Sequence, residues 1–197
     1  MASEGVSTRP IKLISGKSPF CETFFDSVKV PKVNLVGTLN DGWTIAKYLL
    51  THERQMIGGI GETDKKLHIS DEAINVMSKN NGILSDTILR SKISEFEMNE
   101  EIFDLTIRRT MDEEKSGNNS GAASSFFKYY GTELNIQREE LRLKINGFSS
   151  TEWNSKASEN GKQARYFCRT KGNSIEGGTH EVQLNIIAKR ILGLPTK

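Results

Sequence analysis

The sequence contains few of the residues that build metal, disulfide or membrane proteins. Its 197 residues include only two cysteines, three histidines and four prolines. Cys21 and Cys168 are far apart and match no metal-ligand spacing, so they predict neither a disulfide framework nor a metal site. No apolar run approaches the roughly 20 residues needed to cross a bilayer, and the first dozen residues include no signal-like apolar stretch. We therefore expect a cytoplasmic protein without membrane insertion.

An excess of one charge sign is also missing. Twenty-seven lysines and arginines are balanced by 25 aspartates and glutamates, which leaves a formal net charge of +2. Because such a composition creates no extended field of one sign, it argues against a nucleic-acid partner. Binding partners must be inferred from local sites, in a chain long enough for one domain with a sizeable core.

The composition and the apolar pattern of the chain change after the first 39 residues. Three of the four prolines fall in this part, among the β-prone runs STRPIKLIS, ETFFDSVKVP and VNLVG. From Asn40 onward the apolar residues follow helical spacing, and only Pro195 remains. The change predicts a β-rich segment at residues 1–39 and a helical domain at residues 40–197.

Helical periodicity predicts five helices in the second part. The first begins after Asn40 or Asp41 with an apolar stripe of Ile45, Leu49, Leu50, Met56 and Ile57. A short helix capped by Ser70 or Asp71 follows, and then come long helices over 85–115 and 122–147 and a last one over 180–192. The polar stretch 148–163 is expected to be a loop. Such helices favour a mainly α fold of the four-helix-bundle type.

The two long helices each have an apolar face with one polar interruption. Glu100 interrupts the first face and Arg138 the second. The apolar residues are Leu89, Ile93, Phe96, Phe103, Ile107 and Met111 in the first helix and Phe127, Tyr130, Leu134, Leu141 and Ile145 in the second. These faces predict the core.

Two glutamates could carry proton chemistry. Glu176 precedes the Gly177–Gly178–Thr179 stretch, where Thr179 can cap a helix whose free N–H groups attract phosphate or carboxylate, although such glycines can also form a simple tight turn. Glu53 lies one turn beyond Leu49 on the first helix, on or beside its apolar face. Burial there would raise the pKa of its carboxyl, as a proton-abstracting base requires, or an arginine would neutralise it in a structural ion pair.

Two long blocks of the sequence resemble the acyl-CoA dehydrogenase family. They are FCETFFDSVKVPKVNLVGTLNDGWTIAKYLLTHER at residues 20–54 and SIEGGTHEVQLNIIAKRILGLP at residues 174–195, with a looser match in SSFFKYYGTEL between them. The resemblance implies the end of a middle β domain followed by a carboxy-terminal four-helix bundle. It also implies FAD-dependent conversion of an acyl-CoA thioester to trans-2-enoyl-CoA.

The resemblance also assigns the site residues. In many members the base directly precedes the Gly-Thr pair, a position that Gly177 occupies here, so Glu176 stands one residue too early. The long-chain and isovaleryl members instead place the base on the helix of the ER motif. The matching residues are Glu53 as the base and Arg54 as the group that orients it. Cofactor-binding positions carry over to Gly177, Gly178, Thr179 and Glu181.

The implied partners are an acyl-CoA substrate, an electron-transferring flavoprotein and further subunits in a homo- or hetero-oligomer. The family regions that hold most flavin-ring contacts have no match in the chain, so they are expected upstream or on another polypeptide. The family's Phe-Gly pair, which reaches the flavin of a neighbouring subunit, is absent from MSKNNG at residues 77–82. The alternative is a non-catalytic bundle subunit that assembles with a complete dehydrogenase chain.

Overall fold

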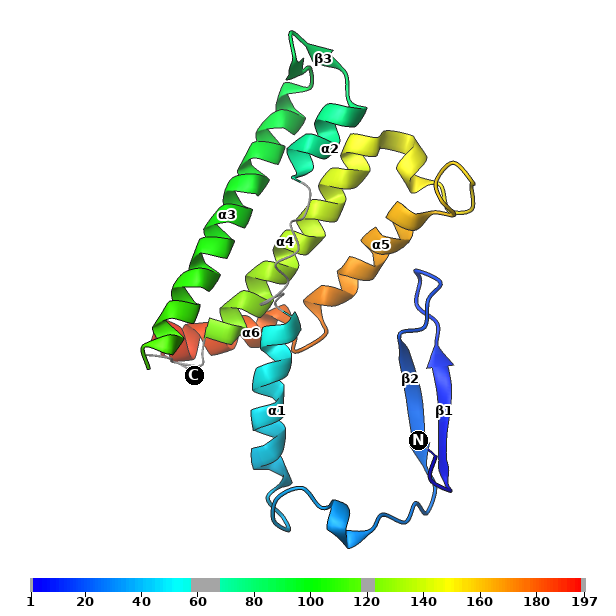
Figure 1. The fold of residues 1–197 in the computed structure, drawn as a ribbon, viewed down its shortest axis with the longest axis vertical. Helices are drawn as coiled ribbons and strands as arrows, with labels where there is room; N and C mark the ends of the chain where they lie inside the picture. Colours follow the sequence, from blue (N-terminus) through cyan, green and yellow to red (C-terminus); the bar gives the residue numbers. More distant parts are fainter. Residues whose placement is uncertain (1, 58–67, 118–122, 196–197) are drawn as a thin grey trace.

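The fold is mainly α, as the sequence predicts, with a β-hairpin at its amino-terminal end (Figure 1). The computed structural model describes residues 2–57, 68–117 and 123–195, and the side chains of residues 51–57 and 114 lie outside that description. None of the helices within these ranges is long and apolar enough to cross a membrane.

The hairpin consists of strands β1 (Val6–Ile11) and β2 (Phe20–Phe25), which pair antiparallel from Val6 opposite Phe25 to Ile11 opposite Phe20. Its tip approaches helix α5, where the Arg165 Nη1 donates a hydrogen bond of 3.0 Å to the Ser15 carbonyl (Figure 1). Apart from the half-buried Val6, the residues of both strands are exposed. A two-stranded hairpin is marginally stable by itself in water, so these faces suit a larger sheet.

Helix α1 (Gly42–Ile57) begins directly after Asp41, as predicted, and follows the short 3-10 helix η1 (Lys32–Asn34). Its carboxy-terminal end reaches the bundle, whereas its first turns extend away from it (Figure 1). Leu49 is 66% exposed and Leu50 is 38% exposed. The prediction that these leucines face the core is therefore wrong, because no described element packs over this part of α1.

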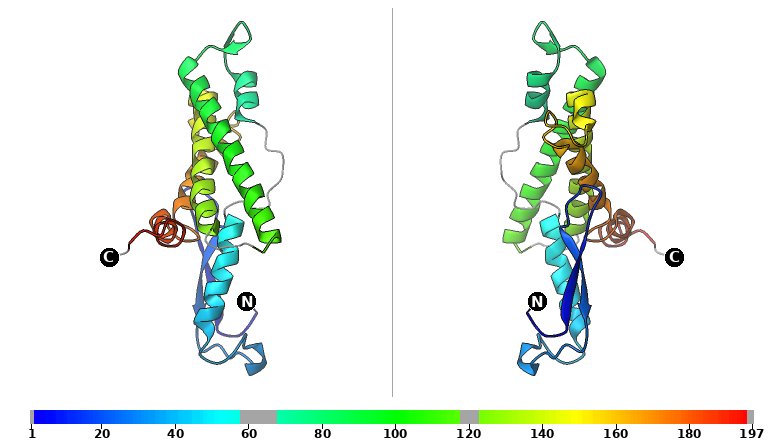
Figure 2. Two further views of the ribbon diagram at one scale, coloured as in Figure 1. Left: turned by 90° about the vertical axis from the view of Figure 1, so that its left-hand side faces the viewer. Right: turned by 90° about the vertical axis from the view of Figure 1, so that its right-hand side faces the viewer.

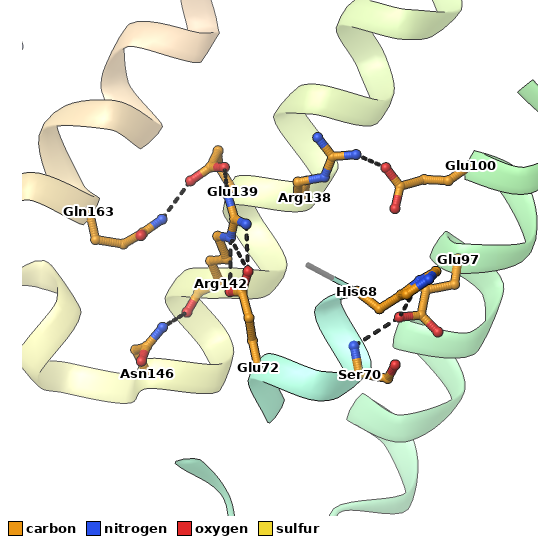
Figure 3. A network of polar contacts seen from close by, with 10 residues as sticks. All are labelled: His68, Ser70, Glu72, Glu97, Glu100, Arg138, Glu139, Arg142, Asn146 and Gln163. Carbon is orange, nitrogen blue, oxygen red and sulfur yellow. Dashed lines mark hydrogen bonds and ion pairs between the residues drawn. The ribbon is translucent and has the colours of Figure 1, made fainter. Parts of the chain in front are cut away.

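Helix α2 (Ile69–Val76) buries Ile69 and Ala73 against the bundle. The predicted cap at Ser70 or Asp71 is wrong, because the helix begins after His68 and the side chain of His68 makes no capping hydrogen bond. Instead the Glu97 Oε1, from the next long helix, accepts the Ser70 N–H at 2.8 Å (Figure 3). A short hairpin of β3 (Lys79–Asn80) and β4 (Ile83–Leu84) then turns at Asn81 and Gly82, both at positive φ.

Helices α3 (Thr87–Lys115) and α4 (Ala123–Asn146) pack along one another and carry most of the core (Figures 1 and 2). Of the predicted apolar faces, Ile107, Met111 and Tyr130 are half-buried and the others are buried, namely Leu89, Ile93, Phe96, Phe103, Phe127, Leu134, Leu141 and Ile145. Asp86 caps α3, since its Oδ1 accepts the Leu89 N–H at 2.9 Å. The 3.6-residue periodicity thus identified the core correctly.

The two polar interruptions of these faces meet each other. Arg138 Nη2 forms an ion pair with Glu100 Oε1 between α4 and α3, at side chains that are 11% and 22% exposed (Figure 3). The Arg138 guanidinium also lies over the Phe96 ring, 5.7 Å from its centroid. Each charge is therefore largely removed from water beside its opposite, which offsets the cost of desolvating both.

The stretch predicted as a loop contains a 3-10 helix, η2 (Gly147–Thr151), and the beginning of α5 (Lys162–Thr170). Helix α5 was not predicted, because it has only nine residues and directly follows a long polar stretch, although Ala164, Phe167 and Cys168 have helical spacing. It packs on α4, where Ala164 and Thr170 are buried. Tertiary packing rather than local propensity thus stabilises this helix.

The carboxy-terminal segment crosses one end of the bundle (Figure 2). A 3-10 helix, η3 (Lys171–Ser174), leads into a glycine turn and then into α6 (His180–Ile186). The predicted helix over 180–192 is present as α6 and the π-helical η4 (Ile187–Ile191). The turn between η3 and α6 holds Gly177, Gly178 and Thr179, and the first turn of α6 holds Glu181, the fourth predicted cofactor-binding residue.

Candidate functional site

The predicted catalytic residues lie in the last turns of α1. Glu53 and Arg54 belong to the helix, which continues to Ile57, but their side chains lie outside the described residues. Their roles as base and orienting group therefore stay predictions. The helix end that carries them lies at the same end of the bundle as α6 (Figure 1).

The predicted cofactor-binding turn has a backbone that only glycine adopts easily. Gly177 has a φ of 67° and Gly178 a φ of 96°, and both angles are strained for residues with a Cβ. A Cβ added at Gly178 would collide with Nε2 of Gln183. Two consecutive glycines are thus needed for the shape of this turn, whatever it binds.

Thr179 and Glu181 form the polar start of α6. Thr179 is the N-cap, and its Oγ1 accepts the Val182 N–H at 3.3 Å. The pKa of the exposed Glu181 carboxyl is lowered by a hydrogen bond from its own backbone N–H and by another from the Thr179 hydroxyl. The capping role expected for Thr179 is confirmed, and a carboxylate in the first turn suits the helix dipole.

Glu176 is engaged in a structural ion pair. Arg169 of α5 donates to both of its carboxylate oxygens, at distances from 2.9 to 3.2 Å. The Asn173 Nδ2 also donates to its Oε1. Both carboxylate oxygens are thus engaged by side chains of α5 and of the segment before the turn. The geometry therefore favours the structural role for Glu176.

Helix α4 supports the entry to the turn through buried polar groups. Lys128 is fully buried, and its Nζ donates to the Asn173 carbonyl at 3.0 Å. Burial lowers the pKa of Lys128, while the nearby carboxylates of Glu176, Glu181 and Glu133 raise it in part. Lys128 of α4 thus fixes the segment before the turn. The only sign of this contact in the sequence is a lysine among aromatic residues.

His180 anchors the first residue of α6 to α4. Its Nε2 lies 2.8 Å from Thr132 Oγ1 and its Nδ1 lies 3.1 Å from Glu133 Oε1. Tyr129 meets the imidazole edge-on, with ring centroids 5.0 Å apart. Desolvation by burial is the main cause that lowers the pKa of His180, followed by the charge of Lys128. This histidine is a structural anchor in the described fold.

Gln183 supports the turn from the other side. It is fully buried, and its Nε2 donates to the carbonyls of Gly177 at 3.1 Å and Gly178 at 3.5 Å. Its Oε1 meets no hydrogen-bond donor among the described residues. The sequence did not identify Gln183, although it stands one helical turn after the predicted cap.

The polar network elsewhere in the bundle is structural. Arg142 of α4 donates to both oxygens of Glu72 in α2, and it also pairs with the buried Glu139 at 2.7 Å (Figure 3). Gln163 of α5 donates to the second oxygen of Glu139 at 2.6 Å. Within the described ranges, no three histidine, cysteine, aspartate or glutamate side chains gather as a metal site would require. Cys21 and Cys168 are free, in agreement with the sequence.

Comparison of the sequence with known protein families gives a match over most of the chain. The family described as "Acyl-CoA dehydrogenase, C-terminal domain" matches residues 40–192. Acyl-CoA dehydrogenase IpdE1 of Mycolicibacterium smegmatis is 29% identical over 196 residues, which cover 97% of this chain and 46% of that protein. The chain thus spans about half the length of this curated relative.

Solved structures are similar over the whole chain. The Tcur3481–Tcur3483 steroid ACAD G363A variant superposes with a TM-score of 0.80 at 24% identity and covers 100% of this chain and 51% of its own. The ChsE4–ChsE5 complex from Mycobacterium tuberculosis has a TM-score of 0.75 at 25% identity and covers 100% and 52%. These similarities confirm the fold expected from the sequence.

Proposed function

Since this chain belongs to the acyl-CoA dehydrogenase family, with its carboxy-terminal domain at residues 40–192, we propose that it supplies that domain to an FAD-dependent enzyme. The enzyme converts an acyl-CoA thioester to the trans-2-enoyl-CoA. The observation that carries the proposal is the family match over most of the chain, together with a glycine turn whose shape leaves backbone donors open. Residues 1–39 supply the end of a middle β domain, and residues 40–197 form the helical domain.

Glu53 is the base that removes the α-proton of the thioester, and Arg54 orients its carboxylate. Two observations support this assignment over Glu176. Gly177 occupies the position of the usual family base, and Glu176 is held by Arg169 at 2.9 Å. A carboxylate on the inner end of α1 remains as the candidate, where desolvation would raise its pKa toward the value that proton abstraction needs.

The turn residues Gly177, Gly178, Thr179 and Glu181 bind FAD. Their chemistry fits this cofactor, because the N–H groups of Gly178 and Thr179 meet no acceptor among the described residues and can donate to its oxygens. The absence of a Cβ at Gly177 and Gly178 allows close approach to the backbone. When bound, FAD accepts the hydride that leaves the β-carbon of the thioester.

The active enzyme is an oligomer, and its electrons pass to an electron-transferring flavoprotein in the cytoplasm. Exposed apolar residues support assembly, since the hairpin leaves Phe24 and Phe25 at 45% and 72% exposure and α1 leaves Trp43 at 71%. The similarity to a complex of two named chains, ChsE4 and ChsE5, favours a hetero-oligomer. Such a partner could supply the sheet that covers β1 and β2.

The substitution Glu53→Gln tests the base. In the complete protein that contains this chain, or in its complex with the polypeptide that supplies the rest, we expect dye-linked acyl-CoA oxidation to fall at least about a hundredfold. FAD content and acyl-CoA binding should stay close to the unsubstituted level, because the amide keeps the size of the carboxylate. Turnover and binding are measured on the same preparations.

The matched control is Glu101→Gln, which makes the same change at an exposed position of α3 and should leave turnover unaltered. Near-normal turnover in the Glu53→Gln enzyme would exclude Glu53 as the base. A non-catalytic subunit, the alternative role, predicts that Glu53→Gln and Glu101→Gln are equally silent in an assembly whose activity resides on another chain.

A further inference from the structure

Gln183 sits beneath the glycine turn with its amide turned toward the turn's carbonyls. Its side chain is fully buried, and Nε2 donates to Gly177 O at 3.1 Å and to Gly178 O at 3.5 Å. The approach is so close that a Cβ at Gly178 would collide with Nε2. The two carbonyls are thereby fixed toward the interior of the protein.

The direction of the two carbonyls also determines the direction of the N–H groups that follow them. In a planar trans peptide the C=O and the following N–H point in opposite directions, and the described residues contain no cis peptide bond. Because the carbonyls of Gly177 and Gly178 face Gln183, the N–H groups of Gly178 and Thr179 face away from it. Neither N–H meets an acceptor within the described ranges.

From this geometry we infer that Gln183 is a positioning residue, which holds the N–H groups of Gly178 and Thr179 as a preset pair of donors for an acceptor oxygen of FAD. The inference rests on the proposed function, since it names the residue that prepares the cofactor-binding turn. Gln183 does not touch the ligand itself. Its role is to keep the two donors oriented before FAD arrives, which lowers the entropy lost on binding.

The rest of the turn cannot supply this orientation. Lys128 and Asn135 of α4 bind Asn173, at its carbonyl and its side-chain Oδ1, both at 3.0 Å, and so fix the chain four residues before Gly177. Thr179 Oγ1 fixes the start of α6 through Val182. Between these anchors, Gln183 holds the peptides that follow Gly177 and Gly178. Its two hydrogen bonds are the only ones that the carbonyls of Gly177 and Gly178 accept from the described residues.

The first test uses the 197-residue chain without any ligand. Gln183→Met keeps the length of the side chain and removes its amide donors. We expect the ¹⁵N order parameters of Gly178 and Thr179 to fall from about 0.85 in the unsubstituted chain to below about 0.6, while those of α3 and α4 stay unchanged. Gln137→Met, the same change at an exposed position of α4, should leave all these values unaltered. Gln183→Asn, whose amide is one methylene too short, serves the same test if the methionine variant does not fold.

The second test adds FAD to the apo form of the complete protein. Gln183→Met should weaken FAD binding about tenfold, the loss expected for one or two neutral hydrogen bonds, and should shift the visible absorption of the bound flavin. A lower melting temperature with the same dissociation constant and spectrum would show that Gln183 is merely structural and would overturn the inference, as would unchanged order parameters. If the unsubstituted protein bound no FAD, the proposed function and the role of this turn in it would fail, whereas the order parameters would still report whether Gln183 fixes the peptides.

Discussion

Glu100 and Arg138 form an ion pair between α3 and α4, inside an otherwise apolar interface. Both charges are largely removed from water, and burial lowers the pKa of the Arg138 guanidinium. A buried pair of this kind is costly to break, because either charge alone would be left without its counterion. The same pair contributes little compared with two apolar residues of similar size.

We therefore expect Arg138→Met to lower the free energy of unfolding by about 3 kcal/mol, and Glu100→Leu to do the same. The double variant should be within about 1 kcal/mol of the original chain, since no unpaired charge remains. Urea denaturation measures all three. Glu159→Gln, which removes the exposed pair with Lys162, is the control and should change stability by less than about 0.5 kcal/mol. Additive losses in the double variant would contradict this account.

At the scale of single residues, the sequence predicted where a residue lies on its helix better than which residue it contacts. Glu100 and Arg138 were visible as interruptions of two apolar faces, but their pairing depends on how α3 and α4 align. Gln183 was not identified at all, because its contacts are with backbone carbonyls whose direction depends on a turn of two glycines at positive φ. Local spacing contains no information on such contacts.

Among the elements, α2 is a short helix that polar contacts join to both α3 and α4. The helix has only eight residues, too few for stability by itself, and buries Ile69 and Ala73. Glu72 ties it to α4 through hydrogen bonds of 2.9 and 3.1 Å from Arg142 Nε (Figure 3). The contact joins α2 to the network that continues through Glu139 into α5.

Glu72→Ala should loosen α2 without unfolding the bundle. The loss of charged hydrogen bonds, about 2 kcal/mol, predicts roughly 30-fold faster amide hydrogen exchange in residues 69–76 and little change in α3 and α4. Asp71→Ala removes the same charge from an exposed position of the same helix and should change exchange there by less than about threefold. Equal exchange in the two variants would show that Glu72 does not hold α2.

Prediction at this scale succeeded where a helix has a strong apolar period. Helices α3 and α4 are long and amphipathic, so both their extents and their buried faces were predicted. Helix α5 was missed because its nine residues are too short a segment to stand out after the polar stretch before it. Leu49 shows the converse case: it belongs to the apolar stripe of α1, yet it is 66% exposed in the described part of the chain.

For the molecule as a whole, the exposed surfaces and the comparisons agree. The hairpin and the first turns of α1 extend from the bundle and expose aromatic and aliphatic side chains (Figures 1 and 2). The chain spans 46% of the length of IpdE1 and 51 to 52% of the chains in the similar solved structures. Apolar surface of this extent is typical of an interface, so we expect these elements to be covered in the complete assembly.

The measurement that tests the account most directly is the anaerobic visible spectrum of the complete protein or assembly after addition of acyl-CoA. The acyl-CoA is taken from a panel of straight-chain, branched and ring-bearing thioesters. The account predicts that at least one thioester bleaches the oxidised flavin band in the unsubstituted and Glu101→Gln proteins, whereas the band persists in Glu53→Gln. Bound flavin that no thioester reduces, or equal bleaching in Glu53→Gln, would contradict it.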